Sequence, residues 1–459
     1  MILRPYQENL VAQARSLISN QARSVLIVAP CGAGKTALTA HMIGRAAARG
    51  KRAWFINHRI ELVDQSSAAF SAVGIKHGII AAGEPETDAL VQVCSIDTLR
   101  RRMDRLAPPD LVVWDECHRQ AARSWDNLYN ACSTSIHIGL TATPIRLDGT
   151  GLGKWFQHMI EGPTVRELTA QGYLSPASTF APTVVDLAGV SSRGGEYSLE
   201  ELDRAVSDPK IIGSAITEYN RRMPGGRALV FCVSIRHSEE TAAAFRAAGI
   251  RAAHLDGTTD KATRRDTMNA LRRGDINVIT NCSLFSEGVD APALDGIIML
   301  RPTQSVGLYT QMVGRALRVA PGKTRAVILD HVGNYIRHGL YDEPRTWSLE
   351  SKKKRRKKQP EMPVKTCPLC FWVGAAGART CGDCGHIFAP SPNQARAINE
   401  ELGSLSEIKG FRRPERTPAE RRTRAISLAK CRSLDDFVKL ANEWGYKQGW
   451  AHIMWKMRK

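Results

Sequence analysis

The sequence predicts an α/β protein with two tandem parallel-sheet domains, followed by a small metal-binding segment and a helical tail. Short apolar runs of strand length alternate with helical stretches in residues 24–140 and again in residues 228–329. Such alternation is typical of parallel sheets covered by helices on both faces. At 459 residues, of which 43% are hydrophobic, the chain is long enough for two or three domains.

The first series begins with an apolar strand at residues 24–29, continues into a loop, and enters a helix from Thr36 to Ala48 that Gly50 closes. This order of strand, loop and helix is the usual setting of a phosphate-binding loop. Further strands are expected at residues 52–56, 111–114 and 136–140. We place the first domain at residues 1–175 and a connecting segment at residues 176–225.

The second series repeats the pattern, with one helix expected at residues 239–248 and another ending at Gly274. Its predicted strands are residues 228–233, 252–255, 276–280, 297–300 and 326–329. We place the second domain at residues 226–345. Two such sheets in tandem predict two lobes with a cleft between them.

The C-terminal part of the chain is strongly basic. The net charge is +19, and residues 351–459 supply +14 of it. We expect a basic linker at residues 346–364 and a basic helical tail at residues 391–459, with helices beginning after Thr417 and at Ser433. A basic tail on a nearly balanced body indicates a polyanion partner, most simply nucleic acid.

Two features of this basic part have more than one interpretation. The run Lys352–Lys358 is interpreted as a non-specific phosphate-binding segment, although a nuclear-localisation-like tract or a solvated linker has the same composition. Four tail aromatics could stack on bases or could pack small helices together. They are Trp444, Tyr446, Trp450 and Trp455.

Residues 29–36, Ala-Pro-Cys-Gly-Ala-Gly-Lys-Thr, match a phosphate-binding loop in which Ala29 replaces the first glycine. Gly32 and Gly34 let backbone N–H groups turn toward phosphate oxygens, Lys35 reaches the terminal phosphates, and the Thr36 hydroxyl can ligate magnesium. The loop therefore predicts a site for ATP and magnesium.

A pair of acids, Asp115 and Glu116, follows the apolar run at residues 111–114. Two adjacent acids at the end of a buried strand are costly unless a cation or water occupies the site. Asp115 would hold magnesium through water, and Glu116 would orient or deprotonate the attacking water. The alternative is an acid pair solvated by a loop.

Four of the eleven cysteines form two paired C-x-x-C motifs, and the other seven occur singly. The pairs are Cys367 with Cys370 and Cys381 with Cys384, which suit tetrahedral zinc held by four thiolates. Four thiolates leave no open position, so we predict a structural zinc ribbon at residues 365–390, with His386 as a bystander. Such a ribbon could bind nucleic acid or a protein partner, or could only fold a spacer.

Several short motifs occur in the order found in one family of motors, and the chain resembles the superfamily two helicases of the DEAD/DEAH-box kind over about residues 1–340. Asp115-Glu-Cys-His118 stands for the box. The other matching segments are Arg4–Gln7, Ala29–Thr36, Asn57–Arg59, Thr98–Leu99, Thr141–Pro144, Phe231–Ser234, Ser286–Asp290 and Gln311–Arg318. The resemblance implies two RecA-like lobes and a nucleic-acid-dependent ATPase.

The resemblance also assigns roles to individual residues. Gln7 would read the adenine edge with Tyr6 or Arg4 beside the ring, and Gly288 and Asp290 would meet the nucleotide or its sugar. Arg315 and Arg318, with Gln311 on the same helix face, would point at the γ-phosphate. Thr141 and Thr143 would link ATP state to nucleic-acid grip, although a hydroxyl-capped turn explains them equally well. Arg59, Thr98 and Ser234 are candidates for strand phosphates.

These features predict an ATP-dependent helicase or translocase in which lobe closure follows ATP binding. DNA is favoured over RNA because the segments 172–174 and 330–334 look more like those of bacterial and phage DNA helicases. An ATP switch or recruitment clamp that does not unwind is the alternative from another class, and an RNA helicase is a further one. No membrane span or signal peptide is recognisable, so we expect a cytoplasmic protein without a membrane partner.

Overall fold

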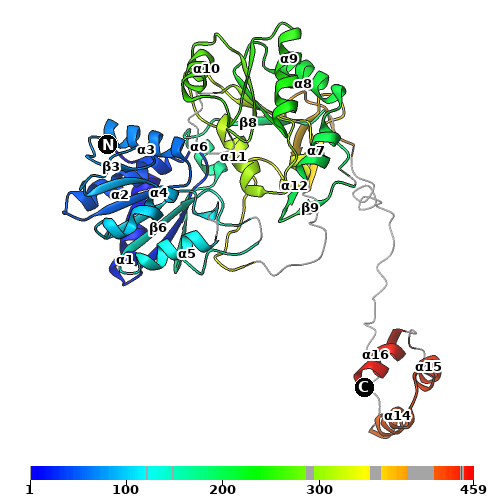
Figure 1. Cartoon of the computed structure of the whole chain (residues 1–459). Coiled ribbons are helices and arrows are strands. Elements are labelled where there is room, and N and C mark those ends of the chain that lie inside the picture. Colours follow the sequence, from blue (N-terminus) through cyan, green and yellow to red (C-terminus); the bar gives the residue numbers. More distant parts are fainter. Residues whose placement is uncertain are drawn as a thin grey trace. The chain divides into compact units, whose positions relative to one another are not determined.

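The computed structural model describes most of the chain and divides it into two compact units (Figure 1). The units are Met1–Pro390 and Ser391–Lys459. The described residues are 2–119, 122–146, 149–182, 185–187, 189–285, 294–351, 363–389, 418–444, 446 and 449–458. Within them, no helix has the length and apolar character needed to cross a membrane.

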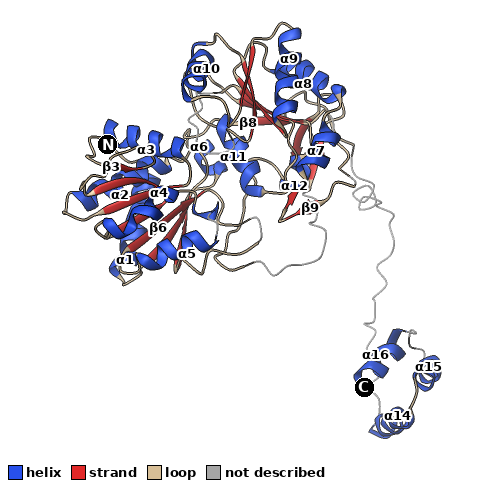
Figure 2. Cartoon of the chain, in the orientation of Figure 1, coloured by secondary structure: helices blue, strands red, loops and turns tan. Residues whose placement is uncertain are grey.

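The first lobe is a seven-stranded parallel sheet. Its strands are β1 (Ser24–Val28), β2 (Ala53–Asn57), β3 (Gly78–Ile80), β4 (Val91–Ser95), β5 (Leu111–Trp114), β6 (Ile136–Thr141) and β7 (His158–Glu161). They lie in the order β3-β4-β2-β5-β6-β1-β7. Figure 2 shows the strands of this sheet with helices around them. The central strands are buried along their length, because helices cover both faces and both sets of alternating side chains must be apolar.

Helices pack on the two faces of this sheet. One face carries α1 (Pro5–Ser19), α2 (Lys35–Ala47) and α3 (Ile60–Ala72), and the other carries α4 (Ile96–Arg102) and α5 (Ala122–Ala131). Strand alternation sorts the core accordingly: Phe55 and Val113 belong to the α2 face, whereas Trp54 and Trp114 belong to the α5 face. Two 3-10 turns, η1 (Met103–Arg105) and η2 (Cys117–Arg119), follow α4 and β5.

The second lobe contains an eight-stranded sheet. Its strands are β8 (Ala177–Phe180), β11 (Ala228–Cys232), β12 (Ala252–Leu255), β13 (Val278–Cys282), β14 (Gly296–Met299), β15 (Ala326–Asp330), β16 (Val364–Thr366) and β17 (Trp372–Ala375). The order is β12-β13-β11-β14-β15-β8-β17-β16. The first six strands are parallel to one another, and the last two pairings, β8 with β17 and β17 with β16, are antiparallel. The prediction of two parallel α/β RecA-like sheets is therefore confirmed.

Helices α8 (Pro209–Arg222) and α9 (Ile235–Ala247) cover one face of the second sheet, and α10 (Lys261–Arg273) and α11 (Val306–Ala316) cover the other. The remaining elements of this unit are α6 (Val165–Ala170), α7 (Leu199–Val206), α12 (Asn334–His338) and the ribbon of β9 (Ser192–Arg193) with β10 (Glu196–Tyr197). Gly274 ends α10 in the left-handed conformation, as its position in the sequence suggests.

The expected connecting segment at residues 176–225 carries β8, α7 and α8 of the second lobe. The expected zinc ribbon also joins this lobe, because Trp372 and Val373 of β17 pair with Phe180 and Thr179 of β8. The sequence patterns predicted neither the strand β8 nor the pairing of the cysteine segment with it, because β8 is short, half-buried and separated in sequence from its neighbour β15. The second sheet is therefore assembled from segments far apart in the chain.

A strap formed by residues 345–351 leaves the second lobe and lies on the first. Arg345 Nη2 donates to His338 O at 2.8 Å, and Gly153 N donates to Leu349 O at 2.9 Å. Trp347 and Leu349 pack against the apolar core of the first lobe. These residues fall in the segment expected to be a basic linker, whose charged run Lys352–Lys358 lies outside the described residues.

The described residues of the second unit form three helices, α14 (Pro418–Lys430), α15 (Leu434–Glu443) and α16 (Gly449–Arg458). Ser433 caps α15 as predicted, with its hydroxyl accepting from Asp436 N, whereas α16 was not predicted. Trp444, Tyr446, Trp450 and Trp455 pack around a core built on Phe437 and Leu440. The packing interpretation of these aromatics therefore holds, and the Arg424 guanidinium lies 4.3 Å from the Trp444 ring and 5.9 Å from the Tyr446 ring.

Candidate nucleotide site and four-cysteine cluster

The loop between β1 and α2 has the backbone shape of a phosphate-binding loop. Gly32 and Gly34 adopt positive φ of 84° and 74°, which side chains other than glycine rarely adopt. Each also has a neighbour that leaves no room for a Cβ, since Leu174 Cδ2 and Gln7 Nε2 would lie 2.7 and 2.6 Å from it. Gly34 is the residue from which α2 starts, so the N–H groups of the first turn face the loop.

Gln7 and Tyr6, expected to contact adenine, hydrogen-bond to carbonyl groups of the loop. Gln7 Nε2 donates to Ala33 O at 3.0 Å and to Gly34 O at 3.3 Å, while its Oε1 accepts from Arg4 N at 2.9 Å. The Tyr6 hydroxyl donates to Ala33 O at 2.7 Å. The amide of Gln7 is thus already used by loop carbonyls, which sequence reasoning did not anticipate.

Asp115 and Glu116 follow β5 directly, facing the loop. Lys35 Nζ lies 3.4 Å from Glu116 Oε1 and 3.3 Å from Ala29 O. Glu116 has a φ of 43°, in the left-handed region that is unfavourable for a glutamate. The loop lysine and the acid pair are therefore brought into one buried group, as the motifs predict.

The two carboxyl groups differ in their environments. Burial, together with the charge of Glu116, raises the pKa of Asp115 to about 6. Burial also acts to raise the pKa of Glu116, but Lys35 and His118 outweigh it and hold that pKa below its ordinary value. Burial acts to lower the pKa of Lys35, and Glu116 reverses this so that the net shift is upward. The pair thus favours an ionised Glu116 beside a charged lysine.

His118 connects the acid pair to the end of β6. Its Nδ1 lies 3.4 Å from Glu116 Oε2 and 2.7 Å from the Thr141 hydroxyl. Thr141 Oγ1 also donates to Thr143 O and accepts from Thr143 N, each at 3.0 Å. His118 and the turn at Thr143 therefore share the Thr141 hydroxyl as a common hydrogen-bond partner. The hydroxyl-capped turn is present, and His118 connects it to Glu116.

A cavity of about 630 Å³ joins the loop and the acid pair to the second lobe. Gln311, Arg315 and Arg318 line it together with Lys35, Thr36, Asp115 and Glu116. Gln311 is buried, and neither atom of its amide has a partner in the described structure. Arg315 Nε donates to Phe285 O at 3.2 Å. The cavity therefore gathers three motifs, the first and last of which are 275 residues apart in the chain, from Thr36 to Gln311.

One expectation about these cations needs correction. Helix α11 ends at Ala316, so Arg318 does not share a helix face with Arg315 as predicted. Lys323 Nζ donates to the carbonyls of Ala316 and Arg318, which satisfies the end of the helix without a further turn. Both arginines nevertheless line the cavity.

Close contact of the lobes depends on Gly314 in α11. A Cβ built there would lie 2.3 Å from the Cβ of Cys31 in the phosphate-binding loop. Two ion pairs also cross between the lobes, Glu61 with Arg264 at 2.9 Å and Asp64 with Lys261 at 3.2 Å. Neither pair was predicted, because residues of opposite charge in distant helices carry no signal in one sequence.

Other candidate residues have different positions. Gly288 and Asp290 lie outside the described residues. The Ser234 hydroxyl accepts from His237 N and contacts Asp203 Oδ1 at 2.6 Å, so it caps α9. Tyr173 lines the cavity beside Arg4, whose guanidinium lies 4.5 Å from its ring. Tyr173 was missed as a site residue, although the segment 172–174 carries part of the family resemblance.

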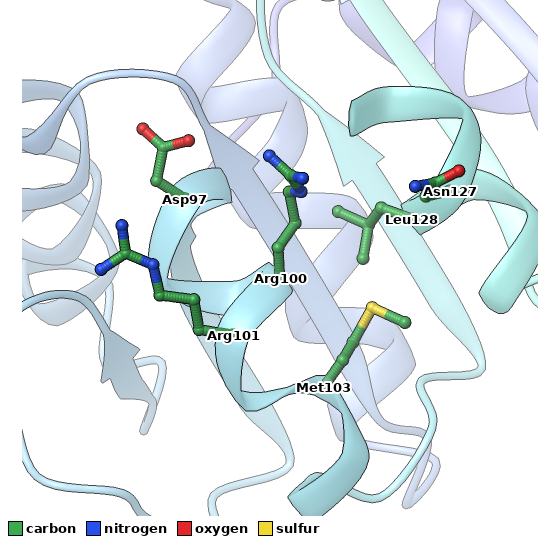
Figure 3. Close-up of a pocket in the computed structure, with 6 residues that line it drawn as sticks. All are labelled: Asp97, Arg100, Arg101, Met103, Asn127 and Leu128. Atoms are coloured by element: carbon green, nitrogen blue, oxygen red, sulfur yellow. The ribbon is translucent and has the colours of Figure 1, made fainter. Parts of the chain in front are cut away.

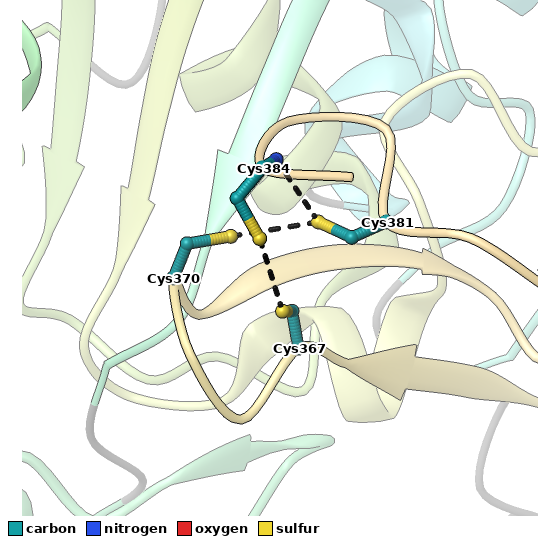
Figure 4. Close-up of side chains that lie close together, drawn as sticks. All are labelled: Cys367, Cys370, Cys381 and Cys384. Carbon is teal, nitrogen blue, oxygen red and sulfur yellow. Dashed lines mark hydrogen bonds between the residues drawn. The ribbon is translucent and has the colours of Figure 1, made fainter. Parts of the chain in front are cut away.

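The four paired cysteines form one cluster (Figure 4). Their sulfur atoms all lie within 4.8 Å of one another, with Cys367 and Cys384 separated by 3.7 Å and Cys370 and Cys381 by 3.5 Å. A tetrahedral zinc site with bonds of about 2.3 Å places its sulfur atoms about 3.8 Å apart. The spacing is far too long for disulfides at about 2.0 Å, so the donor set fits a tetrahedral metal.

The cluster is attached to the second lobe by a partly buried charge pair. Asp383, between Cys381 and Cys384, lies 2.9 Å from Arg222 Nη1 of α8. Arg222 Nη2 also donates to Cys370 O at 2.6 Å, and its guanidinium lies 4.0 Å from the Phe180 ring. The cysteine segment is therefore part of the second lobe and not a separate domain.

Comparisons with known proteins agree with this architecture. Residues 1–146 match the family model described as Type III restriction enzyme, res subunit, and residues 210–320 match the helicase conserved C-terminal domain. A 51.5 kDa protein of Lactococcus phage (isolate 7-9) is 31% identical over 366 residues, which cover 79% of this chain and 78% of the relative.

More distant relatives include longer proteins. The Schizosaccharomyces pombe protein that carries the name of a mitochondrial ATP-dependent helicase, irc3, is 28% identical, and the match covers 74% of this chain and 59% of that protein. The Escherichia coli Type I restriction enzyme EcoAI endonuclease subunit is 25% identical, with 71% and 46% covered. The chain thus spans about half of the length of these relatives.

Solved structures share the fold. The Type ISP restriction-modification enzyme LlaBIII has a TM-score of 0.56 at 18% identity, and the match covers 72% of this chain and 28% of LlaBIII. A fragment of an HsdR subunit of a type I restriction enzyme from Vibrio vulnificus YJ016 has a TM-score of 0.58 at 19% identity, with 74% and 67% covered. With both helicase family models matched in order and a phage relative aligned over most of the chain, this protein belongs to the superfamily two helicases and is an ATPase.

Proposed function

We propose that this protein is a DNA-dependent ATPase that translocates along or unwinds DNA. The observation that carries the proposal is the single cavity of about 630 Å³ lined by the phosphate-binding loop, the acid pair and the arginines of the second lobe. A site built from both lobes is complete only when they meet, so ATP binding favours closure and hydrolysis releases it.

Within this proposal, each charged group has a task in phosphoryl transfer. Lys35 leaves Glu116 and moves to the terminal phosphates, and Glu116, ionised and freed, orients or deprotonates the attacking water. Arg315 and Arg318 stabilise charge that develops on the γ-phosphate, and Gln311 offers its unpartnered amide to the same region. Thr36 and Asp115 would hold magnesium, which supplies charge neutralisation on the phosphate oxygens.

The chain from Glu116 through His118 to Thr141 supports coupling between the nucleotide and the lobe interface. Thr143, at the end of this chain, lies against the second lobe, since a Cβ on Gly307 would be 3.0 Å from its Oγ1. A change in the charge of the acid pair therefore has a short covalent and hydrogen-bonded path to the surface where the lobes meet. This path is a candidate for linking ATP state to grip on the strand.

DNA is favoured as the polymer. The restriction subunits among the relatives and LlaBIII, whose structure is titled as bound to DNA, support that choice. On the first lobe, Arg100 and Arg101 of α4 border a cavity of about 400 Å³ between α4 and α5 (Figure 3). Asp97, Met103, Asn127 and Leu128 complete its lining. We assign these exposed guanidinium groups, next to Thr98, to strand phosphates.

We further propose that the four cysteines hold a structural zinc ion. The sulfur separations of 3.5 and 3.7 Å support tetrahedral coordination by four thiolates, which leaves no position for substrate. Because β17 extends the second sheet, zinc would stabilise that lobe in addition to its own loops.

Steady-state ATP hydrolysis tests the proposed function, with no polymer, single-stranded DNA, duplex or forked DNA, and RNA added in turn. Strong stimulation by DNA is expected, and Glu116→Gln should abolish it while exposed Glu239→Gln in α9 leaves it unchanged. If only RNA stimulated hydrolysis, the polymer substrate would be RNA and not DNA. Cooperative binding of ATP and DNA with slow turnover and no strand displacement would instead support a switch that clamps nucleic acid.

A further inference from the structure

We propose that Asn57 is a positioning residue of the ATP site, which holds, through ordered water, the carboxylate of Asp115 that faces magnesium. The inference rests on the proposed nucleotide site and adds a residue that the motifs do not assign to it. In the sequence, Asn57 stands only at the start of a segment whose arginine is expected to contact nucleic acid.

The position of Asn57 follows from strand register. Ile56 of β2 pairs with Trp114 of β5 in parallel, so Asn57 and Asp115 are the next residues of adjacent strands. Asp115 N donates to Ile56 O at 3.0 Å, which continues the pairing at this end. Because Phe55 and Val113 face α2, alternation directs Asn57 and Asp115 to that same face.

The side chain of Asn57 is buried, and its polar atoms lack hydrogen-bond partners in the described structure. Its exposed fraction is 0%, and neither its Nδ2 nor its Oδ1 has a partner in the described structure. Thr39 of α2 is also fully buried with an unpartnered hydroxyl, and α2 packs against both β2 and β5. Asp115 lines the nucleotide cavity, and Asn57 lies next to it at the end of the adjacent strand without lining that cavity.

A buried amide without partners is costly, and native structures satisfy such groups with protein atoms or ordered water. An amide can donate and accept at once, and a buried water needs two to four polar partners. The layer between α2 and the sheet offers the Asn57 amide, the Thr39 hydroxyl and the Asp115 carboxylate. Water held there would fix the carboxylate in the orientation that a hydrated magnesium ion requires.

The alternative is that Asn57 is a bare buried amide with no role. The two accounts predict opposite results for Asn57→Leu. An apolar side chain of similar size should raise the melting temperature in both cases or leave it unchanged, because it removes an unsatisfied group. Only the positioning role predicts that the variant loses the gain in nucleotide affinity that magnesium provides.

The experiment measures binding of a fluorescent ADP analogue with magnesium and with EDTA, together with the melting temperature. In Asn57→Leu we expect the magnesium-dependent gain to fall by about tenfold, the size typical of removing an outer-sphere partner of a metal. Asn57→Ser, which keeps a water-binding hydroxyl, should retain more of the gain than Asn57→Ala. This second pair keeps the test decisive if the leucine variant does not fold.

Thr179→Val in β8 is the matched control, because Thr179 is also buried with an unpartnered hydroxyl but lies in the second sheet. It should leave the magnesium dependence intact. A full magnesium gain in both Asn57→Leu and Asn57→Ala would overturn the positioning role. If the unmodified protein shows no magnesium-dependent binding at all, the proposed nucleotide site itself is wrong.

Discussion

Lys35 Nζ lies 3.4 Å from Glu116 Oε1, so the loop lysine is paired with the acid proposed to act on water. Each side chain is about one-eighth exposed, at 13% and 12%. A buried pair of this kind keeps both groups charged, and it must separate when phosphate competes for the lysine. The two groups proposed to act on ATP, Lys35 and Glu116, are therefore paired with each other in this structure.

Lys35→Ala should abolish ATP turnover, because it removes the cation that reaches the terminal phosphates and that holds the pKa of Glu116 low. Nucleic-acid binding in the absence of ATP should persist, since the basic C-terminal part is unchanged. Hydrolysis rates and fluorescence anisotropy with labelled DNA check both statements. Exposed Lys51→Ala is the control, and normal turnover in Lys35→Ala would refute the site assignment.

Magnesium-dependent nucleotide binding should weaken as pH falls below about 6. Burial raises the pKa of Asp115 to about 6, and the protonated acid cannot serve a cation, so the affinity gain falls about tenfold per pH unit below that value. The free energy of unfolding should change in the opposite direction. Because the pKa of Asp115 is raised in the folded protein, its ionisation lowers stability as the pH rises from the ordinary pKa of an aspartate to about 6.

The measurement is binding of a fluorescent ADP analogue between pH 5 and 8, with and without magnesium. Asp115→Asn should bind more weakly and should lose the pH dependence that belongs to Asp115, which separates it from titration of the nucleotide phosphates. An identical pH profile in the variant and the unmodified protein would show that Asp115 does not face the ion.

Gly314→Ala should lower ATP turnover by at least about tenfold. The added Cβ would meet the Cβ of Cys31 at 2.3 Å, so α11 must move away from the phosphate-binding loop and take Arg315 with it. Gly213→Ala in α8 is the matched helical control, because a Cβ there meets nothing within 4 Å. Turnover and melting temperature together separate misplacement of the lobe from loss of folding.

Removal of zinc should destabilise the second lobe. We expect one zinc per chain by elemental analysis, its loss in Cys381→Ser, and a lower melting temperature of the helicase body after chelation, because β17 pairs with β8. Arg222→Ala should lower the melting temperature, since it removes the contact with Asp383 at 2.9 Å and the bond to Cys370 O, while Arg325 stays 3.5 Å from Asp383. A melting temperature that does not respond to chelation would exclude zinc as a structural part of the lobe.

Deleting residues 391–459 should flatten the salt dependence of DNA binding. On single-stranded DNA, the slope of log affinity against log salt should fall by about 0.7 for each phosphate that the tail had neutralised. The deletion must begin after the cysteine cluster, because removal from residue 351 would also strip β16 and β17 from the second sheet. An unchanged slope would show that the tail does not neutralise DNA phosphates.

Local patterns predicted the strands and helices that carry the site to within one or two residues. The apolar run before Asp115 became β5, and the glycine-bearing loop led into α2. Polar or short elements were missed: β4 contains buried Gln92, and β7 and β8 are four residues long. Such strands are stabilised by their neighbours in the sheet, and the periodicity of their own side chains carries too little signal.

By itself, the sequence determined the family, the phosphate-binding loop, the acid pair and the four cysteines, because each depends on residue types at short fixed spacings. Only the tertiary structure decided that Gln7 braces the loop, that Gly314 meets Cys31, and that the cysteine segment extends the second sheet. These relationships join residues far apart in the chain. Their physical basis is packing and buried hydrogen bonding between surfaces that exist only after both lobes have folded.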